Sequence, residues 1–219
     1  MQATTKEIGF RQHLAFFDDF DEAVITNGTG TGTDWVIAWD QGRQLRGNGA
    51  MSMKTRATTP AAGDTVTATF NSAFRAANQI VLSTNFNYLS ATLVAYITLR
   101  LNIYTGVYLI NPAIRYDVAN TKWQYLDSAG AWQDITGATQ NLYATSYHTQ
   151  AIAIDVTDTD YILAGCDGTT WTLTDISCQV AANTTGRHME IIITIETTGA
   201  AQAETLIDDI LLLRDMAAI

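Results

Sequence analysis

Lysine is nearly absent from this sequence, and no basic patch is visible along it. Only three of the 12 basic residues are lysines, whereas 22 acidic residues bring the net charge of the 219-residue chain to −10. Proteins that hold nucleic acid by its phosphates need clustered lysine and arginine side chains. We therefore expect no nucleic-acid partner.

Long hydrophobic runs are also missing. No apolar stretch approaches the ~20 residues that a membrane-spanning helix needs. The N-terminal sequence MQATTKEIGFRQHLAFF lacks the apolar core of a secretory signal. We expect no membrane partner, and we expect synthesis in the cytoplasm without export. The protein would then stay there or leave inside a particle that is released by lysis.

Motifs of catalysis are missing as well. The three histidines, His13, His148 and His188, are scattered and show no HxH or HxxxH metal spacing. Neither a GxSxG nucleophile elbow nor a P-loop is present. Glu190 and Glu196 share strand parity, but six residues at about 3.3 Å each separate them by roughly 20 Å. That distance is too long for the paired carboxylates of a retaining glycosidase, so we expect a protein that is not an enzyme.

Cysteine is scarce, with Cys166 and Cys178 as the only two residues. Their spacing matches neither a CxxC pair nor a zinc pattern. Buried free thiols of a reducing compartment are favoured over a disulfide between neighbouring strands. The spacing alone leaves both alternatives open.

Threonine, alanine and β-branched or aromatic residues are abundant, and they occur in short alternating runs with only two prolines in the chain. This composition favours strands, and the turn signals between the runs have the spacing of a sandwich or barrel. The most apolar segment, 91–110, is interrupted at Gly106 and predicts two buried strands. We predict a single all-β domain over residues 16–219, preceded by an N-terminal arm over residues 1–15.

The run ETLIDDILLL (204–213) places two adjacent acids in an apolar strand. Because neighbouring side chains of a strand point to opposite faces, we predict one carboxylate on each face of the sheet. A buried unpaired charge is costly. At least one of the two acids therefore needs a cation, an arginine such as Arg214, or backbone N–H groups.

Two segments of the chain resemble the concanavalin-A-like (laminin-G-like) jelly rolls. YHTQAIAIDVTDTDYILAGCDGTTWTL (147–173) has an aromatic-histidine start at Tyr147-His148, a strand that ends at Asp155, and a tight turn at Asp167-Gly168. LIDDILL resembles the last strand of such domains, which pairs with an early acidic segment, here FFDDFDE (16–22). The resemblance implies a two-sheet antiparallel β-sandwich of jelly-roll type, a fold used mostly for binding and structure.

Some of these jelly rolls bind a structural Ca²⁺ where the two acidic segments meet. The corresponding candidate ligands in this sequence are Asp18, Asp19, Asp21, Asp208 and Asp209. Several carboxylate oxygens suit Ca²⁺, whereas crowded carboxylates without a cation repel one another. In the alternative, one acid of each pair faces solvent and the other caps a loop or meets an arginine. Both alternatives stay open.

Aromatic residues provide candidate platforms for sugar rings. We expect the exposed ones to lie between residues 123 and 143, where polar turns flank the aromatics. The candidate carbohydrate-binding residues are Trp123, Tyr125, Trp132 and Tyr143, with Asp134 and Asn141 as hydrogen-bonding partners.

The threonine- and alanine-rich, lysine-poor β sequence resembles virion proteins of tailed phages. It favours a non-enzymatic viral structural protein, a capsid decoration, head-fibre or tail-associated subunit in the virion that stabilises the particle or mediates surface attachment. Its expected partners are capsid or other virion proteins, further copies of itself, for example in a trimer, and a cell-surface glycan. The alternative is a carbohydrate-binding, lectin-like module, and a glycan hydrolase is a distant third.

Overall fold

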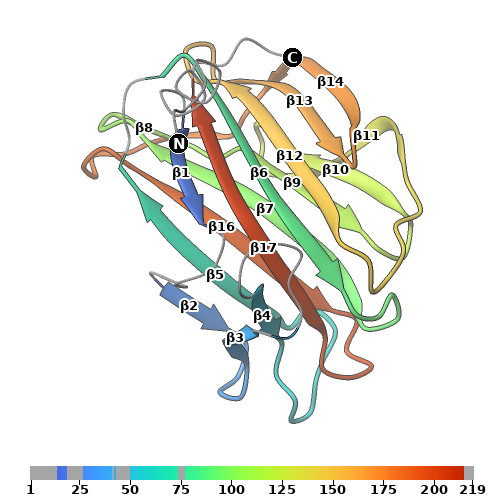
Figure 1. Ribbon diagram of the computed structural model, residues 1–219. Coiled ribbons are helices and arrows are strands. Elements are labelled where there is room, and N and C mark those ends of the chain that lie inside the picture. The colour runs from blue at the N-terminus through green and yellow to red at the C-terminus, as the bar shows by residue number, and fades with distance from the viewer. Residues whose placement is uncertain (1–13, 19–26, 41, 43–49, 74–76, 215–219) are drawn as a thin grey trace, which may run out of the picture.

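The computed structural model describes residues 14–18, 27–40, 42, 50–73 and 77–214 of the chain. These residues form strands in two antiparallel sheets and contain no helix (Figure 1). Sheet A has eight strands: β1 (Leu14–Asp18), β3 (Val36–Asp40), β4 (Ala50–Lys54), β6 (Gln79–Tyr88), β12 (His148–Asp155), β13 (Asp160–Cys166), β14 (Thr169–Ser177) and β17 (Glu204–Arg214). Sheet B has nine: β2 (Asn27–Gly30), β5 (Thr65–Ser72), β7 (Val94–Tyr104), β8 (Tyr108–Ile110), β9 (Ala113–Asp117), β10 (Lys122–Leu126), β11 (Trp132–Thr139), β15 (Val180–Ala182) and β16 (His188–Thr197).

The last strand, β17, lies in the interior of sheet A. The strand order is β14-β13-β12-β6-β17-β4-β3, and β1 also pairs with β17. One edge of β17 pairs with β6, whereas the other edge pairs first with β4 and then with β1. Asp18 lies opposite Ile210. The predicted pairing of the early acidic segment with the last strand is therefore confirmed for residues 16–18, and residues 19–22 lie outside the described part of the chain. Strand β1 begins at Leu14, inside the segment that was predicted as an arm, and residues 1–13 lie outside the described part of the chain.

Sheet B has the order β11-β10-β9-β7-β16-β5-β2, with a short β8–β15 pair at the end of β7. The long segment 91–110 forms two strands, β7 and β8, on either side of Gly106, as predicted. Within the described residues, no helix is long and apolar enough to span a bilayer.

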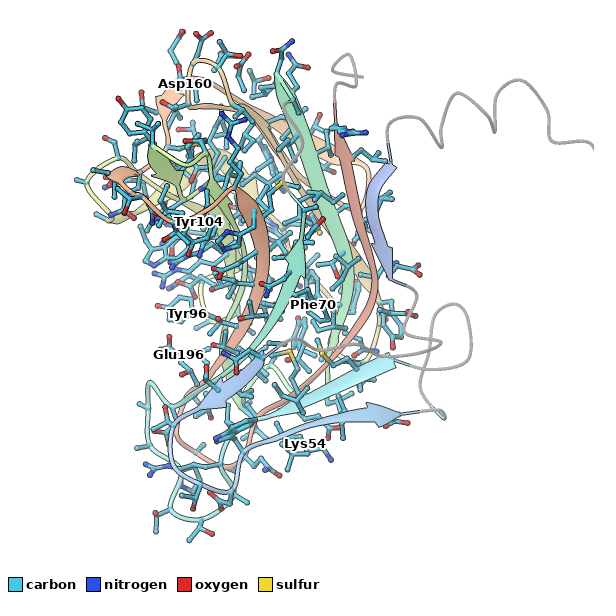
Figure 2. The ribbon with its side chains drawn as sticks, turned by 90° about the vertical axis from the view of Figure 1, so that its left-hand side faces the viewer. Lys54, Phe70, Tyr96, Tyr104, Asp160 and Glu196 are labelled. Carbon is cyan, nitrogen blue, oxygen red and sulfur yellow. The ribbon has the colours of Figure 1, made fainter. Side chains whose placement is uncertain are left out.

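The core lies between the two sheets and follows the period-two alternation of their strands. In β16, Met189, Ile191, Ile193 and Ile195 are buried, and the residues between them are partly exposed. Figure 2 shows the two sheets nearly edge-on, with Phe70 between them. Each such side chain stabilises the fold by roughly 1.5–3 kcal/mol when it is removed from water. Both predictions of fold class, all-β and two-sheet jelly roll, are confirmed.

A β-bulge in β17 changes the expected positions of the two adjacent acids. The pairing with β6 shifts between Asp208 and Ile210, and Asp209 has a φ of 51°. Ile207 and Ile210 both belong to the core. Asp208 lies opposite Asn85, whose side chain also hydrogen-bonds Asp209, so both carboxylates lie on the side of sheet A away from the core. The prediction of one carboxylate on each face is wrong, because the bulge inserts an extra residue into the alternation.

The two cysteines are buried free thiols. Of the two alternatives that the spacing left open, the structure therefore confirms the free thiols. Burial raises the pKa of Cys166 and of Cys178, because the thiolate loses its hydration.

Candidate functional site

The outer face of sheet B, turned away from sheet A, is lined with polar and aromatic side chains. Strand β7 contributes every second residue to it: Tyr96, Thr98, Arg100, Asn102 and Tyr104. From Tyr96 to Tyr104 the strand covers about 26 Å at ~3.3 Å per residue. Figure 2 shows Tyr96, Tyr104 and Glu196 along this side of the sandwich. We refer to this surface as the sheet B face.

At one end of the sheet B face, an arginine lies between two aromatic rings. The Cζ atom of Arg115 is 3.9 Å from the ring centroid of Tyr96 and 4.4 Å from that of Trp132. Its Nε donates a hydrogen bond of 2.7 Å to Oε1 of Gln124. These contacts join β7, β9, β10 and β11 and fix the orientation of both rings. Burial lowers the pKa of Arg115, an effect that the nearby Tyr96, Glu196 and Asp117 oppose.

At the other end of the face, Glu190 is the acceptor of a polar cluster. Asn102 Nδ2 and Tyr104 Oη donate hydrogen bonds of 2.9 and 3.0 Å to Glu190 Oε2. The ring of His188 stacks on that of Tyr104, with centroids 4.0 Å apart and an interplanar angle of 7°. Burial raises the pKa of the Tyr104 phenol, and the bond to Glu190 adds to the effect. The phenol is therefore held as a hydrogen-bond donor.

Trp132 and Asp134, two of the predicted carbohydrate-binding residues, lie on the sheet B face. Trp132 is half-buried against Arg115. Asp134 is exposed and accepts hydrogen bonds from Lys122 Nζ at 2.6 Å and from Gln124 Nε2 at 2.7 Å. The structure thus brings these two candidates together with an arginine and an amide.

Trp123 and Tyr125 lie on the opposite side of their strand. Trp123 has no exposed surface and packs in the core, and Tyr125 packs against the core with its ring edge on Tyr161. The expectation that Trp123 forms part of an exposed platform is therefore wrong. In the sequence KWQYL of β10, the polar residues alternate outward and the aromatics inward.

Asn141 and Tyr143 are both exposed, Tyr143 to 74 %, but neither is in a strand of sheet B. They belong to the connection from β11 in sheet B to β12 in sheet A. The backbone carbonyl of Tyr143 lies 2.9 Å from Nε2 of His148. The Tyr143 ring is thus an exposed aromatic that lies outside the sheet B face.

Several residues of the sheet B face were not among the predicted site residues. They are Tyr96, Arg100, Tyr104, Arg115, His188, Glu190 and Glu196. For those on β7 and β16, the sequence signal is the alternation of polar and apolar residues in 96–104 and 188–196, which is interrupted only at Ile192, whereas Arg115 lies outside both segments. Strand β7 was instead interpreted as buried, which holds only for its inward side.

The candidate calcium ligands can be placed only in part. Asp208 and Asp209 are buried, and the Asp208 carboxylate accepts the backbone N–H of Asp209 at 2.9 Å. Asp19, Asp21 and the side chain of Asp18 lie outside the described residues. In the part of the chain that the structure describes, no three His, Cys, Asp or Glu side chains gather as a metal site would require. Calcium binding stays a prediction.

Comparisons by sequence find no relative of this chain. No protein-family model matches it, and no curated protein matches it.

Comparisons by structure find many similar folds. An endo-β-1,4-glucuronan lyase from the fungus Trichoderma reesei has a TM-score of 0.62 at 9% identity, over 92% of this chain and 95% of the lyase. The cellulose-induced protein Cip1 has a TM-score of 0.58 at 10% identity, over 90% and 96%. A carbohydrate esterase from the Shiga toxin-encoding bacteriophage phi24B has a TM-score of 0.50 at 16% identity, over 93% and 97%. At these identities the likeness is one of fold, and the fold of this chain is the concanavalin-like jelly-roll β-sandwich.

Proposed function

We propose that the protein binds a glycan on the sheet B face without converting it. The observation that carries this proposal is the arrangement of Tyr96, Arg115 and Trp132, in which an arginine orients two rings at a partly exposed surface. Carbohydrate sites combine such rings, which contact the apolar side of a sugar, with a few oriented polar groups.

Polar groups that could hydrogen-bond sugar hydroxyls surround these rings. Gln124 and Asp134 lie beside Arg115 on β10 and β11, and Thr98 lies opposite Arg115 on β7. Thr194 and Thr67, whose hydroxyls are 2.9 Å apart, continue the same row across β16 and β5. The structural likeness to a glucuronan lyase and a phage carbohydrate esterase supports a carbohydrate ligand.

Binding without turnover is supported by the hydrogen bonds of Glu190 and by its distance along β16 from Glu196. Glu190 already accepts hydrogen bonds from Asn102 and Tyr104, and Glu196 lies six residues further along the same strand. Neither carboxylate is paired with the other as a retaining glycosidase requires.

A glycan array followed by calorimetry of the best ligand tests the proposal. We expect Trp132→Ala to weaken binding about tenfold or more, because it removes a ring and releases Arg115. Tyr143→Ala is the matched control, since it removes an exposed ring outside the face and should leave affinity unchanged. A blank array, or equal affinity for Trp132→Ala and the wild type, contradicts glycan binding on this face. Release of products from the bound glycan would contradict binding without turnover.

A second candidate function is that of a subunit of a virus particle, such as a capsid decoration or a tail-associated protein. An apolar surface at the β8–β15 pair favours contact with another protein: Val107, Tyr108 and Val180 are 60%, 52% and 40% exposed. Exposed apolar side chains that lie together commonly mark interfaces. The two functions are compatible, because the β8–β15 pair lies at the Tyr104 end of β7, whereas the rings of the proposed glycan site lie at the Tyr96 end.

Light scattering tests for self-association, and cosedimentation with preformed phage shells tests for particle binding. We expect an oligomer in solution that becomes monomeric when Tyr108→Glu and Val180→Glu are combined. A wild-type monomer that does not cosediment with shells contradicts the particle function.

A further inference from the structure

Two arginines are close neighbours on the sheet B face. Thr98 of β7 lies opposite Arg115 of β9, and Arg100 follows Thr98 by two residues on the same side of β7. Arg100 and Arg115 are therefore diagonal neighbours on one face, at a spacing of about 7–8 Å.

Neither arginine forms an ion pair with a carboxylate of the described residues. On this face, Lys122 pairs with Asp134 at 2.6 Å, and His188 lies 3.5 Å from Glu190, a contact that is an ion pair only when the histidine is protonated. The Nε of Arg115 donates its hydrogen bond to Gln124, whose amide carries no charge. Arg100 is partly buried, and its Nε has no hydrogen-bond partner in the described part of the chain.

This arrangement is unfavourable for the protein alone. A partly buried cation without a carboxylate in contact loses hydration, and the unpartnered Nε of Arg100 leaves a hydrogen bond unmade. Burial lowers the pKa of both guanidinium groups, as this loss of hydration predicts. An anion between the two side chains would remove both costs.

The rows on either side limit where an anion would bind. In the row beyond Arg100, Glu190 lies opposite Asn102 and already accepts hydrogen bonds from Asn102 and Tyr104. Glu196 and Asp117 flank Tyr96 in the row beyond Arg115. The row of Arg100 contains only neutral neighbours, Ile192 on β16 and Ala113 on β9. Negative charge is therefore favoured between Arg100 and Arg115, and disfavoured both at the Tyr96 end of the face and beside Glu190 at the Tyr104 end.

We propose that the glycan bound by the sheet B face is acidic, and that an anionic group of one sugar binds between Arg100 and Arg115. The inference rests on the proposed glycan binding. The planar guanidinium fork pairs with a carboxylate or a sulfate ester through two hydrogen bonds. The rings of Tyr96 and Trp132, on the far side of Arg115, then contact the next sugar ring.

Three hexasaccharides test this inference by calorimetry. The hexamer of β-1,4-linked glucuronic acid and cellohexaose differ only in a carboxylate or a hydroxymethyl group on each sugar. Cellohexaose sulfated at O6 separates the two sources of anionic charge. We expect at least one of the two acidic hexamers to bind about tenfold or more tightly than cellohexaose, and this preference should decrease as salt screens the charges.

Variants of Arg100 provide the second arm. Arg100→Gln should remove the preference for the acidic hexamer, and Arg100→Lys should restore it only in part, since lysine lacks the fork. Lys54→Gln is the control, because it removes a cation from sheet A, and it should keep the full preference. Circular dichroism confirms that each variant is folded.

The outcomes separate this inference from the proposed function. If cellohexaose binds as tightly as both acidic hexamers, the face binds glycans but the inference of an acidic ligand is wrong. It is also wrong if Arg100→Gln keeps the preference. If none of the hexamers binds and the glycan array is blank, glycan binding itself is contradicted.

Discussion

Asn85 donates a hydrogen bond of 3.0 Å from its Nδ2 to Oδ2 of Asp209, the extra residue of the bulge in β17. The Oδ1 of Asn85 in turn accepts a hydrogen bond of 2.6 Å from the hydroxyl of Thr149. One side chain of β6 thus connects β17 to β12 across sheet A. The contact also stabilises a residue in the left-handed region, which Asp and Asn tolerate better than most residues.

Replacing Asp209 tests how much the bulge and its hydrogen bond contribute to the free energy of unfolding. We expect Asp209→Ala to lower the free energy of unfolding by about 2–4 kcal/mol, because the Asn85 amide loses its acceptor and alanine is strained at positive φ. Urea denaturation measures the change. Asp175→Ala is the control: Asp175 also has a positive φ, 65°, but is exposed. It should cost only the backbone strain, about 1 kcal/mol. Equal losses in both variants would contradict a role for the hydrogen bond.

The pKa of Glu196 makes stability depend on pH. Burial raises this pKa above the ordinary 4.5, and the charge of Arg115 offsets the shift only in part. The folded state therefore holds the proton more tightly than the unfolded state, so stability falls as pH rises from about 4.5 through the folded pKa. We expect Glu196→Gln to have a higher Tm than the wild type at pH 7 and nearly the same Tm at pH 4.

Asp134→Asn provides a comparison on the same face, because the pKa shift of Asp134 is opposite in sign to that of Glu196. Lys122 lowers the pKa of Asp134, so the ionised carboxylate favours folding above the ordinary pKa and the benefit is lost as pH falls. This variant should have a slightly lower Tm than the wild type at pH 7. Thermal scans in which Glu196→Gln also lowers Tm at pH 7 would contradict the sign of the Glu196 shift.

The thiols of Cys166 and Cys178 should be inert in the folded protein. Both are buried, and their raised pKa values leave little thiolate at pH 8. We expect iodoacetamide to modify neither cysteine until denaturant is added, as mass spectrometry would show. Dithiothreitol should leave Tm unchanged. Rapid modification, or a Tm that falls on reduction, would contradict this account.

The calcium hypothesis predicts that a chelator destabilises the protein. A site occupied at about 100 times its Kd contributes roughly 2.7 kcal/mol, which for a chain of this size corresponds to a Tm shift of about 5–10 °C. Excess EGTA should lower Tm by this amount, and added Ca²⁺ should restore it. A Tm that stays constant at low free Ca²⁺ would contradict a structural calcium ion.

Much of the fold could be predicted from alternation and turn signals, because these are local properties of the chain. The segment 114–136 belongs to β9, β10 and β11, and the turn residues Asn120-Thr121 and 127–130 separate these strands. The bulge at Asp209 could not be predicted in the same way. It depends on the register of β17 against β6, a pairing between segments that are more than one hundred residues apart.

The candidate site was only partly predictable for a related reason. Trp132 was found because a ring beside polar turns is a plausible platform, but the same argument placed Trp123 on the wrong side of β10. Arg115 was missed because its function arises from Tyr96 and Trp132, which reach it from two other strands. Contacts across strands follow from sheet order, which no single segment of the sequence contains.

The interior position of β17 has a consequence for synthesis on the ribosome. Every other described strand emerges before β17, yet β17 is the strand that joins β6 to β4 and β1. Until it emerges, sheet A consists of three separate parts, β14-β13-β12-β6, β4-β3 and the single strand β1, with open edges and exposed apolar faces. Such edges pair readily with other chains. The nascent protein is therefore expected to depend on chaperones until its last strand is available, and to fold slowly because that strand closes long loops.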